Sequence, residues 1–275
     1  MNKKTIATKS WQYVNTNINS KIRGSLKNLV IWFLSMNKVN KTTGWISFPY
    51  YHHVFDDEIR GFKRQLEYFH QLGDFISLDE AVLLMLSDQP LDARYFCLTF
   101  DDGFKNCYTN AMPLLIEKQI NAAFFLPTKY IGAKIEEDQS LYDDFFAKSK
   151  SIVEFMNWDD VKSMNNSGMT IGSHTVNHTN LATVNEAQVL KELKDSKFII
   201  EEKTGKECKH FCCPWGKPLI NFIPGRDPQT AAYMGYKSFL TTERGRNYSG
   251  LTPFFIQRDH VIATWGNSHL KYHFL

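Results

Sequence analysis

Two neighbouring carboxylates stand at the end of a short apolar run in this 275-residue sequence. Asp101 and Asp102 follow Tyr95–Phe100, which we interpret as a buried strand, and Gly103 comes directly after them. In parallel α/β folds the carboxyl ends of the strands border the binding crevice, and a glycine lets the chain turn close to a ligand. Because adjacent carboxylates repel each other, a buried pair indicates a neutralising cation. The pair predicts a metal site, and a helix N-terminal cap is the alternative use of an Asp here.

A pair of histidines forms the second candidate feature. His174 and His178 follow Met169–Gly172, another predicted strand, and stand four residues apart. If this segment is helical, both imidazoles lie on one face and can bind one ion. A single histidine is most often structural, but together with one Asp the pair supplies two nitrogens and one oxygen. Such a set leaves positions open for water and substrate, which is typical of catalytic sites, and it leaves the other Asp as a base.

These residues lie in short motifs that resemble those of the polysaccharide deacetylases, the NodB-like carbohydrate esterases that remove N-acetyl groups from sugars. The motifs are Thr99-Phe100-Asp101-Asp102-Gly103, Ser173-His174-Thr175 with His178, and Pro214-Trp215-Gly216 after a strand. The resemblance extends from about Trp45 to Trp265. It implies an α/β fold in the form of a distorted, incomplete (β/α) barrel.

The resemblance also implies roles for the residues of the motifs. Asp101 is expected to be the catalytic base, and a divalent metal ion, most often zinc, is expected to polarise the acetyl carbonyl and acidify its bound water. The expected ligands of this ion are Asp102, His174 and His178. In the family a backbone N–H of the third motif stabilises the oxyanion, and here that residue is Trp215. Trp215 and Pro214 are also expected to contact the sugar, with packing as the alternative role of the Trp ring.

The amine leaving group needs a proton donor, and several histidines are candidates. His52, in Tyr51-His52-His53-Val54, resembles the Tyr-His motif of the branch that includes poly-N-acetylglucosamine deacetylases, in which this histidine takes the place of the acid. Because adjacent strand residues point to opposite sides, His52 and His53 are not both expected to face the pocket. His273, close to the end of the sequence, and His260, in a predicted strand, are weaker candidates.

The sequence departs from the family pattern near the third motif. The family often has an arginine two residues before the proline, where it holds the base, and this sequence has Cys212 at that position. Arg258, from a late strand, is the candidate replacement and a candidate substrate contact, although a surface salt bridge is the more common role of such an arginine. Cys208, Cys212 and Cys213 lie on a predicted strand that points alternate residues apart, so we interpret them as core residues rather than thiolate ligands.

Repeated strand–helix units are predicted to position these residues, because short apolar runs alternate with longer amphipathic stretches from Trp45 onward. The expected strands, which we interpret as parallel, are 45–51, 95–100, 122–126, 169–172 and 208–213, with one or two more after Tyr236. The expected helices are 57–72, 78–86, 105–118 with a kink at Pro113, 158–166 and 186–203. Residues 127–151 show little periodicity, which predicts a long loop or lid over the site.

The first 44 residues are predicted to form a basic segment that precedes a single domain over residues 45–275. Residues 1–55 hold eight Lys or Arg residues and no Asp or Glu, although the net charge of the chain is only +3. Apolar residues recur at spacings of three and four between Ile18 and Phe33, which predicts an amphipathic helix. This helix either lies on an anionic membrane surface or packs on the main domain. No nucleic-acid-binding motif accompanies the charge, so nucleic acid is not an expected partner.

Composition limits the class of protein. Hydrophobic residues make up 43% and charged residues 22% of the sequence, which excludes a disordered or fibrous chain. No apolar run approaches the roughly 18 residues of a spanning helix, and no secretory signal is recognised, so we expect a cytoplasmic protein. It would contact the inner membrane face if the basic segment binds there. The five cysteines form no paired C-x-x-C motifs and are expected to be reduced thiols.

Together these features predict a metal-dependent hydrolase that removes N-acetyl groups from an amidosugar, an oligosaccharide or a lipid-linked glycan precursor. The same centre is chemically suited to another amide, such as a formamide or a cyclic imide. The missing motif arginine leaves a third hypothesis open, in which the chain is an inactive glycan-binding module of the same fold.

Overall fold

The computed structural model describes residues 4–13, 31, 34, 44–147, 149 and 151–275 of the chain. The amphipathic helix predicted between Ile18 and Phe33 lies almost entirely outside these residues. Within the described part, no helix has the length and the hydropathy needed to cross a membrane.

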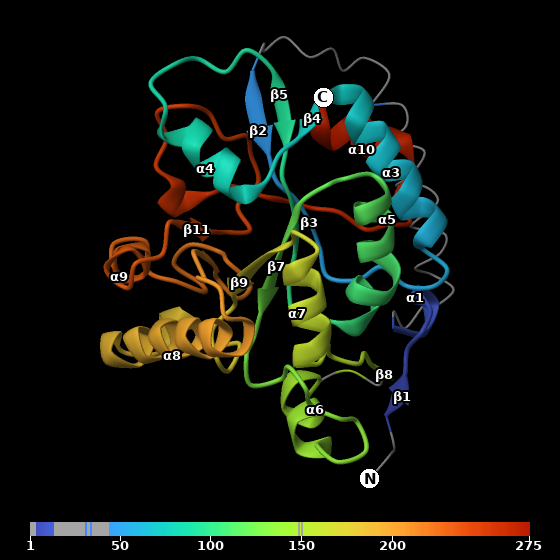
Figure 1. The fold of residues 1–275 in the computed structure, drawn as a ribbon, viewed down its shortest axis with the longest axis vertical. Helices are drawn as coiled ribbons and strands as arrows, with labels where there is room; N and C mark the ends of the chain where they lie inside the picture. Colours follow the sequence, from blue (N-terminus) through green and yellow to red (C-terminus); the bar gives the residue numbers. More distant parts are fainter. Residues whose placement is uncertain (1–3, 14–30, 32–33, 35–43, 148, 150) are drawn as a thin grey trace.

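A seven-stranded parallel sheet forms the centre of the fold (Figure 1). Its strands, in spatial order, are β11 (Ser238–Leu240), β10 (His210–Cys212), β9 (Thr170–Ser173), β7 (Ala122–Leu126), β6 (Leu98–Phe100), β3 (Pro49–Tyr51) and β12 (Asp259–His260). All of these neighbours pair in parallel, so the carboxyl ends of the strands meet along one edge. Strands β11 and β12 stand at opposite ends of this order, but the residues just before β12 contact β11, where Leu240 and Ile256 form an isolated parallel bridge. The sheet thus curls into a barrel of seven strands, one fewer than a complete (β/α) barrel. The predicted distorted, incomplete (β/α) barrel is therefore confirmed.

The central strands are apolar on both faces, as parallel strands covered by helices must be. All five residues of β7 are buried, and the rings of Phe100 in β6 and Phe124 in β7 stack with centroids 4.6 Å apart. The surrounding helices are α3 (Ile59–Leu72), α4 (Leu78–Leu86), α5 (Met112–Glu117), α7 (Trp158–Asn166), α8 (Glu186–Thr204), α9 (Asp227–Tyr233) and α10 (Asn267–Phe274).

Local signals fix several helix ends where the sequence predicts them. The Ser77 side chain and Glu80 form a reciprocal capping box at the start of α4. Helix α8 ends at Gly205, whose φ of 70° lies in the left-handed region that favours glycine. Ahead of α5, the predicted kink at Pro113 takes the form of a π-helical turn over Cys107–Ala111. Pro113 has no N–H to donate within the helix, which is consistent with a change of hydrogen-bond pattern there.

Two predicted strands are each divided in the structure. The run 45–51 separates into β2 (Trp45–Ser47) and β3, and the run 95–100 separates into β5 (Arg94–Phe96) and β6. Strand β2 pairs with β5, which pairs with β4 (Asp74–Phe75), in a separate three-stranded sheet. The residues of β2, β3 and β6 are all buried, so their hydrophobic pattern gives no sign of the division.

The segment predicted as a long loop is partly ordered secondary structure. It contains α6 (Gln139–Phe145) and ends at β8 (Ser151–Ile152), so the prediction of an irregular 127–151 segment is wrong in part. Strand β8 pairs with β1 (Thr5–Ile6), and the short helix α1 (Ser10–Tyr13) follows β1. The start of the basic segment is thereby attached to the main domain beside the 127–151 region (Figure 1).

Candidate functional site

The Asp pair forms a tight turn at the carboxyl end of β6. The backbone N–H of Asp101 donates to the carbonyl of Tyr51, 3.0 Å away, which continues the pairing with β3. Asp102 then adopts a φ of 71° and Gly103 a φ of 67°. The positive φ of Gly103 favours glycine, and an added Cβ would also lie 2.6 Å from the Cδ1 atom of Ile131, which would have to move. The following helical segment has no side-chain cap from either Asp, which excludes the helix-cap alternative.

The two histidines come from an irregular loop rather than a helical turn. Residues Thr175 and His178 have φ values of 66° and 54°, so the conditional prediction of a helix over 173–178 is wrong. The buried carboxylate of Glu192, on α8, accepts hydrogen bonds from the backbone N–H groups of Val176 and Asn177 at 2.8 and 3.1 Å. This side chain holds the loop in the shape that turns both imidazoles toward the Asp pair.

Three side chains converge on one point beside the Asp turn. The Nε2 atoms of His174 and His178 lie 3.5 and 3.3 Å from Oδ1 of Asp102, and one ligand atom from each residue lies within 4.8 Å of the others. The Nδ1–H of His174 donates to the carbonyl of Cys212 at 2.7 Å, which leaves Nε2 as the ligand atom. Within the described residues, Asp102 Oδ1 is buried and has no hydrogen-bond partner. Two imidazoles and an orphaned carboxylate oxygen are the donor set of a catalytic zinc site, so these residues fit a divalent ion.

The electrostatics of the three residues agree with this interpretation. Burial favours the neutral carboxylic acid of Asp102, but His174 and His178 outweigh it and hold the pKa of Asp102 well below its usual range. Burial is also the main cause of the lowered pKa of His178. The carboxylate is therefore ionised while His178 favours the neutral imidazole, which is the form that binds a metal.

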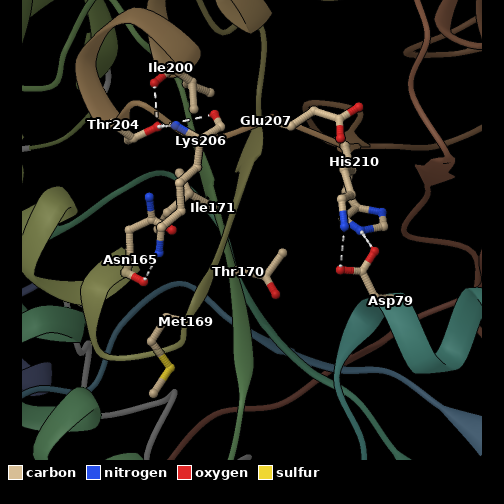
Figure 2. A pocket seen from close by; sticks show the side chains of 11 residues that line it. Asp79, Asn165, Met169, Thr170, Ile171, Ile200, Thr204, Lys206, Glu207 and His210 are labelled. Atoms are coloured by element: carbon tan, nitrogen blue, oxygen red, sulfur yellow. Dashed lines mark hydrogen bonds and ion pairs between the residues drawn. The ribbon is translucent and has the colours of Figure 1, made fainter.

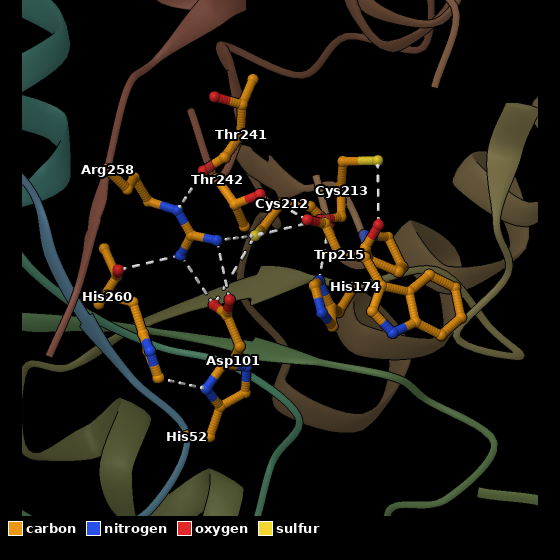
Figure 3. A network of polar contacts seen from close by, with 12 residues as sticks. His52, Asp101, His174, Cys212, Cys213, Trp215, Thr241, Thr242, Arg258 and His260 are labelled. Atoms are coloured by element: carbon orange, nitrogen blue, oxygen red, sulfur yellow. Dashed lines mark hydrogen bonds and ion pairs between the residues drawn. The ribbon is translucent and has the colours of Figure 1, made fainter. Parts of the chain in front are cut away.

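Arg258 binds the other carboxylate of the pair (Figure 3). Its Nη1 and Nη2 atoms donate to the two oxygens of Asp101 at 2.9 and 2.8 Å, and its Nε donates to the carbonyl of Thr241 at 2.7 Å. The guanidinium also lies 4.3 Å from the ring centre of Tyr50. Arg258 is fully buried, so the surface salt bridge considered for it is wrong, and it does not line the cavity as a substrate contact would. Its contact with both oxygens of Asp101 is the one that the resemblance leads us to expect from the absent motif arginine.

The paired guanidinium sets the protonation of Asp101. Burial raises the pKa of this carboxyl, and the charge and hydrogen bonds of Arg258 lower it further than burial raises it. Asp101 is therefore a fixed carboxylate beside the candidate metal ligands, which is what a base needs before the substrate arrives.

A second group of possible ligands, Asp101, His174 and Cys212, does not suit a metal. Both oxygens of Asp101 are occupied by Arg258, which also donates to the Cys212 sulfur at 2.9 Å. A cation placed there would face the guanidinium charge. Burial holds the pKa of the Cys212 thiol well above its usual range, and all five cysteines are free and buried, consistent with core residues.

His52 and His53 directly follow β3, and only His52 lines the cavity over the candidate ligands, while both line an adjoining cavity beside α1, so the expectation that only one of them faces a pocket is met for the first cavity alone. His52 lines the cavity, with its Nε2 3.9 Å from Oδ2 of Asp102, whereas His53 is turned toward the ring of Phe104 at 4.4 Å. The Nδ1 atom of His52 lies 3.3 Å from Nε2 of His260, so His260 orients His52 rather than serving only as a strand residue. Burial, followed by the electrostatic effect of the neighbouring His52, lowers the pKa of His260 to about 4. His260 is then neutral near pH 7 and can accept a hydrogen bond from His52.

Trp215 borders the candidate ligands. Its ring lies 4.4 Å from that of His178 and is 51% exposed, while Pro214 is buried and lies outside the cavity lining. The Trp215 backbone has a φ of 54°, and we find no hydrogen bond from its N–H to another described residue. A backbone donor beside the metal ligands is thus available to a bound oxygen.

The cavity over these residues has a volume of about 810 Å³. Sequence reasoning missed much of its wall: Tyr50, Lys217, Asn221, Thr242, Glu243 and Arg244. One signal was present, because Tyr50 stands two residues before His52 and strand alternation places both on the same side. The other five lie in loops: Lys217 and Asn221 closely follow the third motif, whereas Thr242, Glu243 and Arg244 are far from every motif in sequence. His273 lies outside this cavity, where its ring stacks on Trp265.

A smaller cavity of about 210 Å³ lies at the amino ends of β9 and β10 (Figure 2). There the fully buried His210 has both ring nitrogens occupied, by Ser238 Oγ at 2.9 Å and by Asp79 Oδ1 at 3.2 Å. Ser238 is fully buried as well. This Ser-His-Asp chain therefore offers no accessible nucleophile.

Comparison with known protein families gives one match over more than half of the chain. The family model described as "Polysaccharide deacetylase" matches residues 88–238. Two curated relatives are similar in sequence. A Bacillus subtilis (strain 168) protein named "Putative polysaccharide deacetylase YxkH" is 25% identical over 67% of this chain and 58% of its own length. The "Peptidoglycan-N-acetylglucosamine deacetylase" of Bacillus cereus is 28% identical over 48% of this chain and 40% of its own length, so the chain spans about half of these relatives.

Solved structures show the same fold. IcaB from Ammonifex degensii aligns with a TM-score of 0.68 at 22% identity, over 84% of this chain and 97% of that chain. The Streptococcus pyogenes deacetylase PplD, solved in complex with acetate, aligns with a TM-score of 0.66 at 22% identity, over 84% and 99% of the two chains. At this level of identity the likeness concerns the architecture.

Proposed function

Because the chain belongs to the polysaccharide deacetylase family, we propose that it removes N-acetyl groups from an amidosugar, an oligosaccharide or a lipid-linked glycan precursor by metal-dependent hydrolysis. The observation that carries this proposal is the orphaned Oδ1 of Asp102 between two imidazole nitrogens. Beside it stands a second carboxylate, Asp101, that Arg258 keeps ionised and fixed.

Asp102, His174 and His178 would hold the divalent ion, for which zinc is the proposed identity. When bound, such an ion polarises the acetyl carbonyl and acidifies a water molecule. Glu192 supports two of these ligands indirectly, because its carboxylate fixes the loop that carries both histidines.

Three further groups of the chain act on the reacting atoms. Asp101 accepts a proton from the attacking water at a carboxylate oxygen. The backbone N–H of Trp215 donates a hydrogen bond to the former carbonyl oxygen as negative charge develops on it. His52, oriented by His260, donates a proton to the departing amine, and acetate is the second product. Exposure of the Trp215 ring at the cavity supports a role as a stacking face for the sugar.

The structure weakens the hypothesis of an inactive glycan-binding module. That hypothesis rested on the absent motif arginine, and Arg258 supplies an equivalent contact to both oxygens of Asp101. No observation in the described residues favours a formamide or a cyclic imide over an acetamide.

The proposal is tested by measuring acetate release from N-acetylated sugars together with the metal content of the purified protein. We expect a divalent ion near one equivalent, loss of turnover after chelation and recovery on adding zinc. Full turnover by the metal-free protein, or formate release from formamides without acetate release from acetamides, would contradict it.

We also propose a cytoplasmic location, with the basic segment 1–44 in contact with an anionic membrane surface. The eight basic residues without acidic neighbours in residues 1–55 support it. Full-length protein should float with vesicles containing about one third anionic lipid, and replacing Lys21, Arg23 and Lys27 by Gln should reduce the floating fraction. Recovery of both proteins in the soluble fraction would contradict the membrane contact, and equal flotation of both would contradict the role of these three basic residues.

A further inference from the structure

A second cavity, of about 690 Å³, opens beside the candidate metal centre and shares part of its wall. The residues common to both cavities are His52, Asp102, His178 and Trp215. The rest of the second cavity is mostly aromatic or aliphatic, and we call it the aromatic cavity. Its apolar wall includes Trp11, Tyr13, Phe55, Phe145, Val261 and Ile262.

The N-terminal segment builds one side of the aromatic cavity. Beyond the β1–β8 pairing, the backbone N–H and hydroxyl of Ser10 donate to the two carboxylate oxygens of Asp57 at 3.0 and 2.7 Å, which anchors α1. The Tyr13 ring packs against His53 at 4.8 Å and Phe55 at 5.9 Å. Trp11 stays 62% exposed within this anchored segment. A large apolar ring is thus held at the cavity by a specific set of contacts.

Two polar side chains of the aromatic cavity are already used within the protein, whereas Asp102, which it shares with the metal-centre cavity, keeps an Oδ1 that is unpaired among the described residues. The Ser10 hydroxyl binds Asp57, and the carboxylate of Glu58 accepts the backbone N–H of Phe55 at 3.1 Å. Burial raises the pKa of Glu58 to about 7. None of the described residues lining this cavity is Lys or Arg.

The metal-centre cavity has the opposite character. Its wall contains Lys217, Asn221, Thr242, Glu243 and Arg244, which offer donors and acceptors of both charges. Sugar hydroxyls that are taken out of water need such partners, and an alkyl chain gains from apolar walls without them. A sugar ring is therefore matched to the first cavity, and an apolar group is matched to the second.

We propose that the aromatic cavity binds an apolar aglycone, so that the substrate is an N-acetylated sugar linked to an alkyl-type chain. This inference rests on the proposed function of the adjoining site. The sugar occupies the polar cavity with its acetamide at the metal ligands, and the chain extends past Trp215 and His178 toward Trp11 and Phe145. Trp11 is then a specificity-determining residue that the catalytic motifs do not contain.

The test compares methyl and octyl N-acetyl-β-glucosaminides, the octyl compound being kept below its critical micelle concentration. We expect kcat/KM of the full-length protein to be about tenfold or more higher for the octyl compound, because burying several methylene groups is worth at least that factor. Trp11→Ala should lower kcat/KM about tenfold more for the octyl than for the methyl compound, and Trp11→Phe should restore most of the preference. Tyr233→Ala, a control at a 79% exposed ring on α9 outside both cavities, should change neither value.

Isothermal titration of both glycosides with the zinc-loaded protein separates this inference from the proposed function. If the protein binds the octyl glycoside more tightly than the methyl glycoside and Trp11→Ala removes the difference, the inference about the aromatic cavity is supported. This holds even if no acetate is released, and in that case only the deacetylase proposal fails. Equal binding and equal kcat/KM for the two glycosides would overturn the inference and leave the deacetylase proposal standing. An octyl preference that Trp11→Ala leaves unchanged, with the melting temperature of the variant intact, would also overturn it.

Discussion

Both ends of the central sheet carry a histidine beside an aspartate, and the two clusters differ in how many of their polar atoms are satisfied. At the amino end, His210 binds Ser238 with one ring nitrogen and Asp79 with the other. At the carboxyl end, His174 uses Nδ1 for a backbone carbonyl, and its Nε2 faces an Asp102 oxygen that has no hydrogen-bond partner among the described residues.

The difference shows how to separate a structural cluster from a functional one in this fold. Buried polar atoms are normally paired, and leaving one unpaired costs about 1–3 kcal/mol, more for a charged group. The amino-end cluster meets that requirement from within the protein. At the carboxyl end the Asp102 oxygen faces two imidazole nitrogens at 3.3 and 3.5 Å, a spacing that suits a shared ligand, which is why we assign the chemistry there although both clusters contain the same residue types.

Of the changes that test this comparison, removal of the Asp102 carboxylate should reduce metal binding and turnover most. Asp102→Ala deletes one of three proposed ligands, so we expect loss of the bound ion and a fall in turnover of roughly 10³-fold or more. The metal content and the rate of acetate release are the measurements. Asp79→Ala, the matched change at the other end, should keep both, and a similar loss in that variant would contradict the comparison.

Asp101→Asn should separate metal binding from proton transfer. The amide keeps the shape of the side chain but cannot accept the proton of the attacking water, so we expect turnover to fall about 10²- to 10⁴-fold while the ion is retained. Equilibrium zinc affinity and single-turnover rates check this. Loss of the ion in parallel with the rate would assign Asp101 to the metal rather than to the base role.

Arg258→Lys should lower kcat less than the two preceding changes, because it alters only the position of the Asp101 carboxylate. Lysine keeps the charge but cannot bind both carboxylate oxygens and Thr241 at once, so we expect kcat to fall about 10- to 100-fold with zinc affinity unchanged. The pH dependence of kcat/KM reports whether the base has changed its environment.

A double-variant series provides the control for this position. Arg258→Met should destabilise the protein by about 3–5 kcal/mol, because it leaves Asp101 buried without its partner. Combining it with Asp101→Asn should recover part of that stability, and denaturant unfolding measures the difference. Additive effects would contradict a direct coupling between the two side chains.

The smallest expected effect concerns the amino-end cluster and its dependence on pH. A hydrogen bond from His210 is the main cause that lowers the pKa of Asp79 below its ordinary value of 3.8. A depressed carboxyl pKa stabilises the fold above pH 3.8, and this contribution is lost as the pH falls through the lowered value. The melting-temperature difference between wild type and Asp79→Asn should be a few degrees at neutral pH and should shrink below pH 3.8, with kcat unchanged throughout. A difference that grows with acidity would contradict this sign.

The sequence predicts most of the fold because its signals are local. Apolar runs, the Ser77 cap and Gly205 mark strands and helix ends within a few residues. The same signals miss the division of 45–51 into β2 and β3, since both halves are equally apolar and only pairing with different partners separates them. Helix α6 is missed for a related reason. Its apolar residues follow no regular helical spacing, so its conformation depends on packing against the rest of the domain.

The site residues also fall into a group that local motifs predict and a group that they do not. Asp102, His174 and His178 can be named from short motifs at strand ends, and the structure brings these side chains together. The reason offered for the histidines, a helical spacing, is nevertheless wrong, since Thr175 and His178 reach the Asp turn through left-handed backbone conformations. Arg258 and Trp11 are placed by long-range pairing of β12 with β3 and of β1 with β8, which no local pattern specifies.

The pairing of β12 with β3 has a consequence for how the protein is made. Asp101 lies in the first half of the chain, whereas its guanidinium partner precedes the last strand, 157 residues later. A nascent chain that has not yet extended past Arg258 would have to bury a lone carboxylate, so we expect this part of the sheet to stay open on the ribosome until Arg258 has emerged. Chains truncated before β12 should therefore be substrates for cellular quality control rather than partly active enzymes.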